Sequence, residues 1–174
     1  MEIERKYEVN KLPGDLSQYK FKKIEQGYLC HNPTIRIRKS NDDYILTYKS
    51  KLGLQKVEEG SALIHHEVEL PLTQEAFEVL KVKTDGNFIT KTRYLIPIEN
   101  GLTAELDIFK DNLEGLVFAE VEFPDEKTAN EFIPPDWFGR ELTSDKRFSN
   151  YQLSKITGFH ELNLEPFSNQ TSKK

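Results

Sequence analysis

The sequence has little cysteine and few histidines. Cys30 is the single cysteine among 174 residues, which excludes an internal disulfide. No grouping of cysteine and histidine has the spacing of a zinc site. Cys30 is therefore expected to be a buried or half-buried strand residue, with no structural role in cross-linking.

Long apolar runs and excess positive charge are also missing. No stretch approaches the roughly 20 apolar residues of a membrane-spanning helix, and the N-terminus lacks the basic region and apolar run of a signal peptide. A cytoplasmic protein with no membrane partner is expected. The formal net charge of -5 gives no general basic field, so no nucleic-acid partner is expected either.

Charged and aromatic residues are plentiful. The charged fraction is 30%, the hydrophobic fraction only 37% and the aromatic fraction 11%, which together indicate a folded scaffold with much charge on it. The length favours one domain. We expect this domain to span residues 1–157 and residues 158–174, which end in "SNQTSKK", to form a flexible tail.

Extended segments with alternating polar and apolar residues dominate the chain. Strands are predicted at Glu2–Val9, Lys23–Cys30, Thr34–Lys39, Tyr44–Lys49, Ser61–Leu70, Asn87–Ile98, Thr103–Phe109 and Leu116–Phe123. "SNDDY", "ENG" and "DNLEG" are turn signals between them. Eight antiparallel strands with few helices indicate a mainly β (α+β) fold, either a sandwich or a closed barrel.

Three helices are predicted, each from a start signal. Thr73 caps the segment "PLTQEAFEVLKV", Asp125 begins "PDEKTANEFI" and Ser144 caps "SDKRFSNYQLSKIT". Each segment carries an apolar stripe, so each helix is expected to pack on the outside of the sheet.

One face of nearly every predicted strand is ionic. Because successive strand residues point to opposite faces, the following residues share faces with one another: Glu2, Glu4, Lys6, Arg36, Arg38, Lys49, Glu67, Glu69, Lys91, Arg93, Glu105, Asp107, Glu120 and Glu122. A single strand of this kind is usually just solvated on its polar face. Here like charges recur about 7 Å apart in strand after strand, so each must be neutralised.

A metal-bearing polyphosphate would neutralise both signs of charge. Carboxylates without histidine or cysteine partners suit a hard ion such as Mg²⁺ or Mn²⁺, and rows of lysine and arginine suit a dense anion. If the ionic faces point inward, the strands form an eight-stranded antiparallel closed β-barrel, a tunnel with a charged lumen and helices packed outside.

The ordered set of "EIERKYEV", "TIRIRK", "AEVEF" and "PPDWFGRELTSDKRFSN" resembles a short bacterial single-domain member of the CYTH superfamily, the triphosphate tunnel metalloenzymes. The resemblance covers roughly residues 1–157 and implies an eight-stranded tunnel that binds a triphosphate with Mg²⁺ or Mn²⁺. The implied metal ligands are Glu2, Glu4, Glu120 and Glu122. The implied substrate-binding residues are Lys6, Arg36, Arg38, Lys49, Lys91, Arg93, Lys146 and Arg147. The implied catalytic residues are Glu4, Glu122, Lys6, Tyr28 and Lys91.

Other positions are less well defined by the resemblance. Glu67, Glu69, Glu105 and Asp107 are expected to line the tunnel, where they balance the bases or hold water, with direct metal ligation as the alternative. Tyr28 has inward parity, and some relatives pair a tyrosine here with a tunnel lysine; a core tyrosine is the alternative. Without the resemblance, Lys146 and Arg147 would be interpreted as two exposed residues of a helix. His65 and His66 show no ligand spacing.

The resemblance implies metal-dependent hydrolysis of a small triphosphate, with inorganic tripolyphosphate favoured. The alternatives are a class IV-type adenylate cyclase, a thiamine triphosphatase, and a polyphosphate or nucleotide sensor without turnover. Trp137, the single tryptophan, is expected to pack against the outside of the tunnel rather than to bind an organic group. The sequence leaves a homodimer open.

Overall fold

The computed structural model describes residues 2–51 and 63–169, in which nine strands form one antiparallel sheet. The strands are β1 (Glu2–Val9), β2 (Lys20–Cys30), β3 (Thr34–Ser40), β4 (Asp43–Ser50), β5 (Leu63–Pro71), β6 (Asp85–Pro97), β7 (Thr103–Phe109), β8 (Val117–Glu122) and β9 (Phe138–Glu141). The predicted bounds of β1 and β7 are confirmed, whereas β2 begins at Lys20 rather than Lys23. Ser61, the predicted start of the fifth strand, lies outside the described residues.

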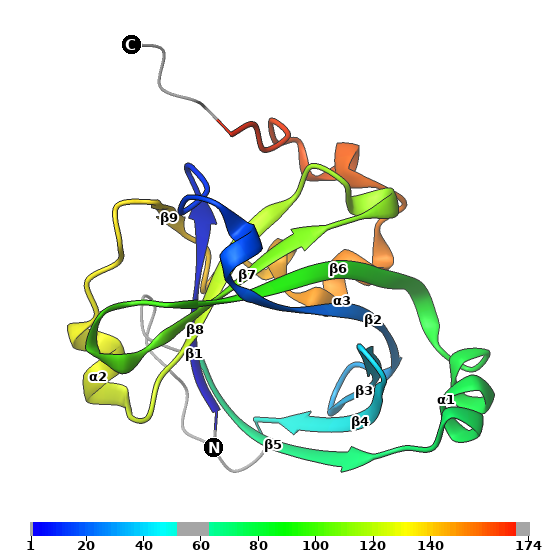
Figure 1. The fold of residues 1–174 in the computed structure, drawn as a ribbon. Coiled ribbons are helices and arrows are strands. Elements are labelled where there is room, and N and C mark those ends of the chain that lie inside the picture. The colour runs from blue at the N-terminus through cyan, green and yellow to red at the C-terminus, as the bar shows by residue number, and fades with distance from the viewer. Residues whose placement is uncertain (1, 52–62, 170–174) are drawn as a thin grey trace.

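The sheet closes into a barrel. Its strand order is β5-β4-β3-β2-β6-β7-β8-β1-β9, and an additional pairing joins β5 to β1, so that β1 to β8 form a ring (Figure 1). One edge of β1 pairs with β8. The other edge pairs with two strands, because its N-terminal half pairs with β5 and its C-terminal half with β9. The predicted closed eight-stranded barrel is confirmed, and β9 is an extra strand that was not predicted.

Short turns with left-handed residues connect the neighbouring strands. Asn41 has φ 53° between β3 and β4, while Asn100 and Gly101 have φ 60° and 70° between β6 and β7. Asp111 and Gly115, with φ 55° and 102°, lie between β7 and β8. Asparagine, aspartate and glycine tolerate this conformation better than other residues, which explains why the polar turn signals in the sequence were reliable.

The helices are short and lie outside the ring of strands. They are α1 (Gln74–Lys81), α2 (Glu126–Glu131) and α3 (Asn150–Lys155). Thr73 accepts a hydrogen bond from Ala76 N and Asp125 accepts one from Thr128 N, so both predicted caps are confirmed. None of the helices in the described ranges has the length and apolar character that a membrane crossing requires.

The prediction of one continuous third helix capped by Ser144 was wrong. The segment divides into a 3₁₀ turn at Lys146–Phe148, capped by Asp145, and α3, which is capped by Ser149. Ser149 interrupts the helix because its backbone is extended, with φ -68° and ψ 138°, which lets its side chain accept from Gln152 N.

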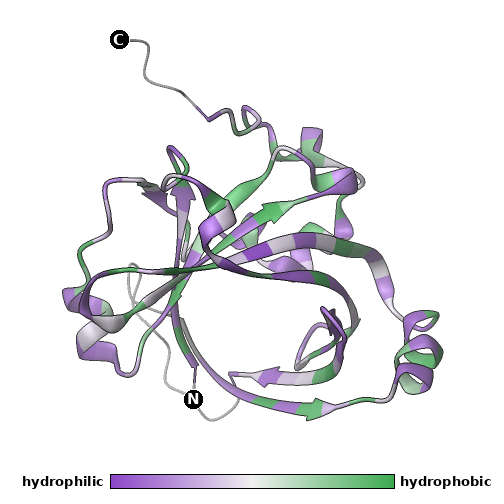
Figure 2. Ribbon diagram, in the orientation of Figure 1, coloured by the Kyte–Doolittle hydropathy of each residue, from purple (hydrophilic) through white to green (hydrophobic). Residues whose placement is uncertain are grey.

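One apolar core lies between the outer face of the barrel and its covering segments. Ile3, Tyr7 and Val9 of β1 are buried there, together with Trp137 and Phe138. Polar and apolar residues alternate along the strands, as the colour changes in Figure 2 show. The outward apolar face and the packing of Trp137 on the outside are therefore confirmed.

Arg5 ties this covering layer to β1. It lies on the outward face between Ile3 and Tyr7, where its Nε donates to Glu141 Oε1 of β9 at 2.9 Å and its Nη1 donates to Ala129 O of α2 at 2.8 Å. One guanidinium thus links β1, α2 and β9, which shows why a charged residue is tolerated on the apolar face.

A second apolar cluster closes one end of the barrel interior. Tyr28, Phe109 and Phe118 come from the strands and pack with Phe148 and Leu153 from the 3₁₀ turn and α3. The inward faces are therefore ionic along only part of their length, because Phe109 and Phe118 continue the rows of Asp107 and Glu120 with aromatic side chains. The ionic lumen ends at this cluster.

Part of the segment expected to be flexible has contacts in the structure. A 3₁₀ turn at Phe159–Leu162 buries Leu162 in the second cluster, and Phe167 N donates to Gly115 O at 2.8 Å. The flexibility predicted for the rest of the tail stays a prediction.

Candidate functional site: an ionic lumen

The ionic side chains of the strands meet inside the barrel. Lys49 of β4 contacts Glu4 of β1, and Arg93 of β6 contacts Glu120 of β8, although neither pair of strands is adjacent in the sheet. Each contact reaches past one intervening strand, which is favoured on the concave inner side of the ring, where side chains converge. The charged residues that alternate with apolar ones along these strands therefore point into the barrel.

Some of the inward carboxylates face one another without full compensation. Glu4 lies opposite Glu122 in the β1–β8 register. Burial, followed by the charge of Glu4, raises the pKa of Glu2 to about 8. Burial and then Glu105, Glu67 and Glu4 raise the pKa of Glu122. Glu2, Glu4 and Glu122 therefore form a region short of positive charge.

Other carboxylates are already satisfied by bases. Glu120 accepts a contact from Lys6 Nζ at 2.9 Å and one from Arg93 Nη2 at 2.6 Å. Burial alone would raise the pKa of Glu120, but Lys6 and Arg93 outweigh it and hold the pKa well below its usual range. The lumen thus contains two kinds of carboxylate, of which only one is short of a counter-charge.

Lys49 gives Glu2 and Glu4 part of the positive charge that they need. Its ammonium forms an ion pair with Glu2 and lies 3.4 Å from Glu4 Oε1 and 3.8 Å from Glu67 Oε2. Burial would lower the pKa of Lys49, but the charges of Glu4 and Glu2 outweigh it and raise the pKa. One monovalent cation thus serves three carboxylates.

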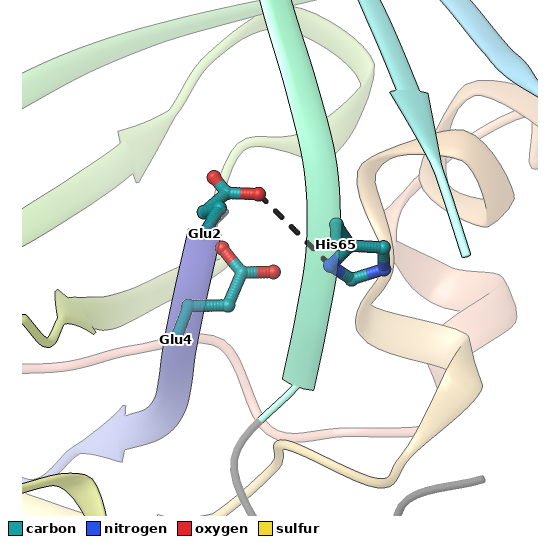
Figure 3. Close-up of side chains that lie close together, drawn as sticks. All are labelled: Glu2, Glu4 and His65. Atoms are coloured by element: carbon teal, nitrogen blue, oxygen red, sulfur yellow. Dashed lines mark ion pairs between the residues drawn. The ribbon is translucent and has the colours of Figure 1, made fainter. Parts of the chain in front are cut away.

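His65 of β5 completes this cluster. It lies opposite Glu2 in the β1–β5 register, and Figure 3 shows its ring pointing toward Glu2 and Glu4. His65 Nδ1 is 3.9 Å from Glu2 Oε2. Because burial and then Lys49 and Lys51 lower the pKa of His65 to about 3, the ring is neutral near pH 7 and this contact is not an ion pair there.

A dense charge network occupies the opposite wall. Arg93 donates from Nε to Asp107 Oδ1 at 2.6 Å and from Nη2 to Asp107 Oδ2 at 2.7 Å, and it also pairs with Glu105. Lys91 Nζ lies 2.5 Å from Asp107 Oδ2, and both of these side chains are fully buried. Burial lowers the pKa of Lys91 to about 8 despite the charge of Asp107. The charges of Lys91, Arg93, Glu105 and Asp107 therefore neutralise one another.

Arg36 and Arg38 of β3 form the least compensated cationic part of the lumen. Arg38 Nε donates to Gln26 Oε1 at 3.0 Å, and no carboxylate of the described residues forms an ion pair with it. Burial, Arg36 and Arg93 lower the pKa of Arg38 to about 10. Arg36 donates to Thr47 Oγ1 at 3.1 Å and lies 3.8 Å from Glu69, while its buried Nε has no partner among the described residues. This wall can accept an anion.

The family model of the CYTH domain matches residues 1–159. The chain belongs to the CYTH domain family. It is 40% identical over 158 residues to an inorganic triphosphatase of Nitrosomonas europaea, covering 88% of this chain and 96% of that one. It is 38% identical to an inorganic triphosphatase of Acetivibrio thermocellus, covering 88% of this chain and 93% of that one.

A solved structure has the same architecture as this CYTH barrel. It is described as the inorganic triphosphatase NE1496 and superimposes with a TM-score of 0.65 at 34% identity, covering 91% of this chain and 97% of that one. The resemblance to the CYTH family that the sequence motifs indicated is thereby confirmed.

The CYTH lumen brings most of the predicted site residues together. The structure places these inward-facing residues along its walls: Glu2, Glu4, Lys6, Arg36, Arg38, Lys49, Glu67, Glu69, Lys91, Arg93, Glu105, Asp107, Glu120 and Glu122. The carboxylates outnumber the bases. Glu67, Glu69, Glu105 and Asp107 lie near basic side chains, in the arrangement expected of groups that balance them.

Three of the predicted site residues lie apart from this ionic part of the CYTH lumen. Tyr28 faces inward but belongs to the apolar cluster at the closed end, where its hydroxyl accepts from Gln26 Nε2 at 3.1 Å. Lys146 is exposed, and Arg147 is exposed with its guanidinium held by Asp145 Oδ2 at 2.7 Å. Phe148 O of the same turn accepts from Lys6 Nζ at 2.7 Å, so the turn itself reaches the lumen.

Three lumen residues were not found from the sequence. His65, Gln26 and Thr47 share the inward face with Glu67, Tyr28 and Lys49 respectively, and each contacts or approaches an ionic group. Strand parity with these neighbours was the available signal, but a neutral side chain does not stand out in a charged row.

Proposed function

We propose that this CYTH protein hydrolyses inorganic tripolyphosphate to diphosphate and phosphate with the help of a divalent cation, Mg²⁺ or Mn²⁺. The single observation that carries the proposal is the presence, inside one barrel, of carboxylates with too little compensating positive charge and of a guanidinium wall. The names and the 38–40% identity of the two triphosphatases support this choice of reaction. The cytoplasmic location stays a prediction.

The carboxylates suit a hard divalent cation. Glu2, Glu4 and Glu122 offer oxygen donors of the kind that Mg²⁺ and Mn²⁺ prefer. The raised pKa values of Glu2 and Glu122 support a need for a cation at this place. Glu120 is proposed as a fourth ligand, although it would have to share its oxygens with Lys6 and Arg93. When bound, the cation would neutralise phosphate oxygens and polarise the terminal phosphoryl group.

The basic residues divide the work of binding the anion. Arg38 and Arg36 are proposed to bind phosphate oxygens directly, because their guanidinium groups have the fewest carboxylate partners in the described lumen. Lys6 and Lys49 could turn from carboxylates to phosphate oxygens. Lys91 and Arg93 are proposed to act mainly by holding Asp107, since Lys91 is fully buried against it.

Hydrolysis needs a water in line with the terminal phosphorus. Glu122 is the last residue of β8 and is exposed there, where it lines a pocket with Glu105, Phe123 and Pro124. Its carboxylate, together with Glu4 opposite, is proposed to orient this water and receive its proton as the oxygen attacks the phosphorus. The bond from the terminal phosphorus to the bridging oxygen breaks, and the diphosphate leaves with that oxygen.

The alternative functions have less support from the described residues. A thiamine triphosphatase would need aromatic surface at the mouth, but Trp137 is 6% exposed in the outer core. A cyclase would need a pocket for adenine, and the described lumen walls are ionic. A sensor would use the same groups without turnover.

A panel of tripolyphosphate, ATP and thiamine triphosphate, each with Mg²⁺ and with Mn²⁺, tests the proposal. Release of phosphate and formation of cyclic AMP are measured in parallel. The expected result is metal-dependent phosphate release, fastest from tripolyphosphate. Tight tripolyphosphate binding without release from any compound would overturn the proposal in favour of a sensor.

A further inference from the structure

We propose that His65 Nδ1 is a third protein ligand of the cation bound by Glu2 and Glu4, and that this nitrogen makes the site prefer Mn²⁺ to Mg²⁺. The inference rests on the proposed function, because it concerns the same cation. It adds a ligand from β5 to a site that the sequence assigns to β1 and β8 alone.

The geometry brings the three donors to one point. Glu2 and His65 are opposite each other in the β1–β5 register, and Glu4 follows Glu2 on the same face. One donor atom from each of Glu2, Glu4 and His65 lies within 4.8 Å of the others, and Nδ1 is 3.9 Å from Glu2 Oε2 (Figure 3). Ligand atoms about 2.1 Å from a common metal lie somewhat closer than this, so small side-chain rotations suffice.

His65 Nδ1 needs a partner that the described residues do not supply. The atom is buried and makes no hydrogen bond with any group in residues 2–51 and 63–169, and the side chain is only 13% exposed. A buried ring nitrogen without a partner is unfavourable. In the tautomer that carries its proton on Nε2, Nδ1 presents a lone pair toward the two carboxylates, which is the arrangement of a metal ligand.

A bound cation would displace the Lys49 ammonium from Glu2 and Glu4. This ammonium contacts Glu2 and Glu4, so it occupies the same oxygens as the cation would. Glu67 Oε2, 3.8 Å from the same ammonium, remains as its partner. Exchange of one ammonium for a divalent ion therefore leaves no charge in this corner without a counter-charge.

A nitrogen ligand changes which cation is preferred. Mg²⁺ demands oxygen ligands in a near-ideal octahedron and releases its water reluctantly. First-row transition ions accept imidazole more readily, and Mn²⁺ is the member of this series that also suits carboxylates. The combination of two carboxylates and one imidazole therefore favours Mn²⁺.

Pulsed electron paramagnetic resonance of Mn²⁺ bound to the full chain without substrate tests the proposal. The wild-type protein is expected to show ¹⁴N coupling to the ion, and His65→Gln is expected to lose it. Since loss of even an outer partner of a metal ligand costs roughly 10–100-fold in affinity, His65→Gln should weaken Mn²⁺ binding at least about tenfold, with a smaller change for Mg²⁺. His66→Gln is the matched control, because this neighbouring histidine is exposed on the other face.

Each outcome decides between the two proposals. Bound Mn²⁺ without nitrogen coupling in the wild type, or with unchanged coupling in His65→Gln, overturns the role of His65 and leaves the proposed hydrolysis intact. Cation-independent hydrolysis overturns the proposed function instead. Should His65→Gln fail to fold, [¹⁵N]histidine labelling of wild type and His66→Gln decides the question, because ligation by histidine replaces the ¹⁴N coupling with ¹⁵N coupling.

Discussion

Glu4 of β1 lies directly opposite Glu122 of β8 in the antiparallel register. Like charges at directly opposed positions destabilise a sheet, and the pKa of Glu122 is raised by burial and by the carboxylates around it. The barrel tolerates this arrangement next to a wall of guanidinium groups. A cation and a polyanion together remove the repulsion on both sides.

Glu122→Gln should remove turnover and leave substrate binding largely intact. The amide keeps the size of the side chain but cannot take a proton from the attacking water, so kcat is expected to fall about 100-fold or more. Steady-state kinetics and calorimetric binding of tripolyphosphate measure the two effects. Glu8→Gln is the control, since Glu8 of the neighbouring strand β1 pairs with Arg140 at the surface. Full activity of Glu122→Gln would contradict its assigned role.

Arg38→Ala should weaken substrate binding more than it slows the chemical step. A hydrogen bond to a charged group contributes about 1.5–3 kcal/mol, so KM is expected to rise roughly tenfold or more. Lys39→Ala is the matched control, because Lys39 lies on the outward face near the Tyr44 ring. An equal rise of KM in both variants would show that only the overall charge matters.

The stability of the cation-free protein should fall as the pH rises from about 4.5 to 8. Folding raises the pKa of Glu2 from 4.5 to about 8, so the folded state keeps a proton in this window that the unfolded chain releases. Above pH 8 the contribution of Glu2 levels off. Because the cation replaces this proton, its apparent affinity should rise through the same window.

Thermal midpoints measured with and without Mn²⁺ across this pH range check the prediction. Glu2→Gln should flatten the decline in the cation-free protein, since the amide does not titrate. An equally steep decline in this variant would assign the effect to another group.

Asp107→Ala should destabilise the fold strongly. The substitution leaves Lys91 fully buried without its counter-charge, and loss of one partner of a buried pair costs about 3–5 kcal/mol of unfolding free energy. Asp136→Ala, which breaks the exposed pair with Lys11, should cost less than about 1 kcal/mol. Urea unfolding compares the two variants, and similar losses would contradict the buried role of Asp107.

Lys146→Ala should raise KM more than Arg147→Ala does. Both side chains are exposed, but the Arg147 guanidinium is engaged by Asp145, whereas Lys146 forms no ion pair with the described residues. Steady-state kinetics of the two variants decide the order. No change in either KM would remove both residues from the substrate-binding set.

The barrel could be predicted because its cause is local. A period of two with charge on one face extends through β1, β3, β5, β7 and β8, and turn residues separate these strands. β9 escaped prediction because Phe138–Glu141 is short and lacks alternation; its strand conformation comes from pairing with β1. The cap at Ser144 was wrong because Asp145 and Ser149 offer competing acceptors within a few residues.

The site was predictable only as far as strand parity reaches. Parity identifies the inward carboxylates and bases, but it does not reveal which of them neutralise each other. The pairing of Lys91 with Asp107, and the lack of a carboxylate partner for Arg38 among the described residues, depend on the register of the strands and on the depth of each side chain in the barrel. His65 was missed because neighbouring histidines look equivalent until the pairing with Glu2 is known.

The ring of strands is closed by a short stretch of pairing, Glu2 with His65, Ile3 with Ile64 and Glu4 with Leu63. The same stretch carries the proposed cation ligands, and they come from both sides of the seam. A bound ion would therefore link β1 to β5 and stabilise the pairing that closes the barrel. Amide hydrogens of the paired residues would then exchange more slowly with the ion bound than without it.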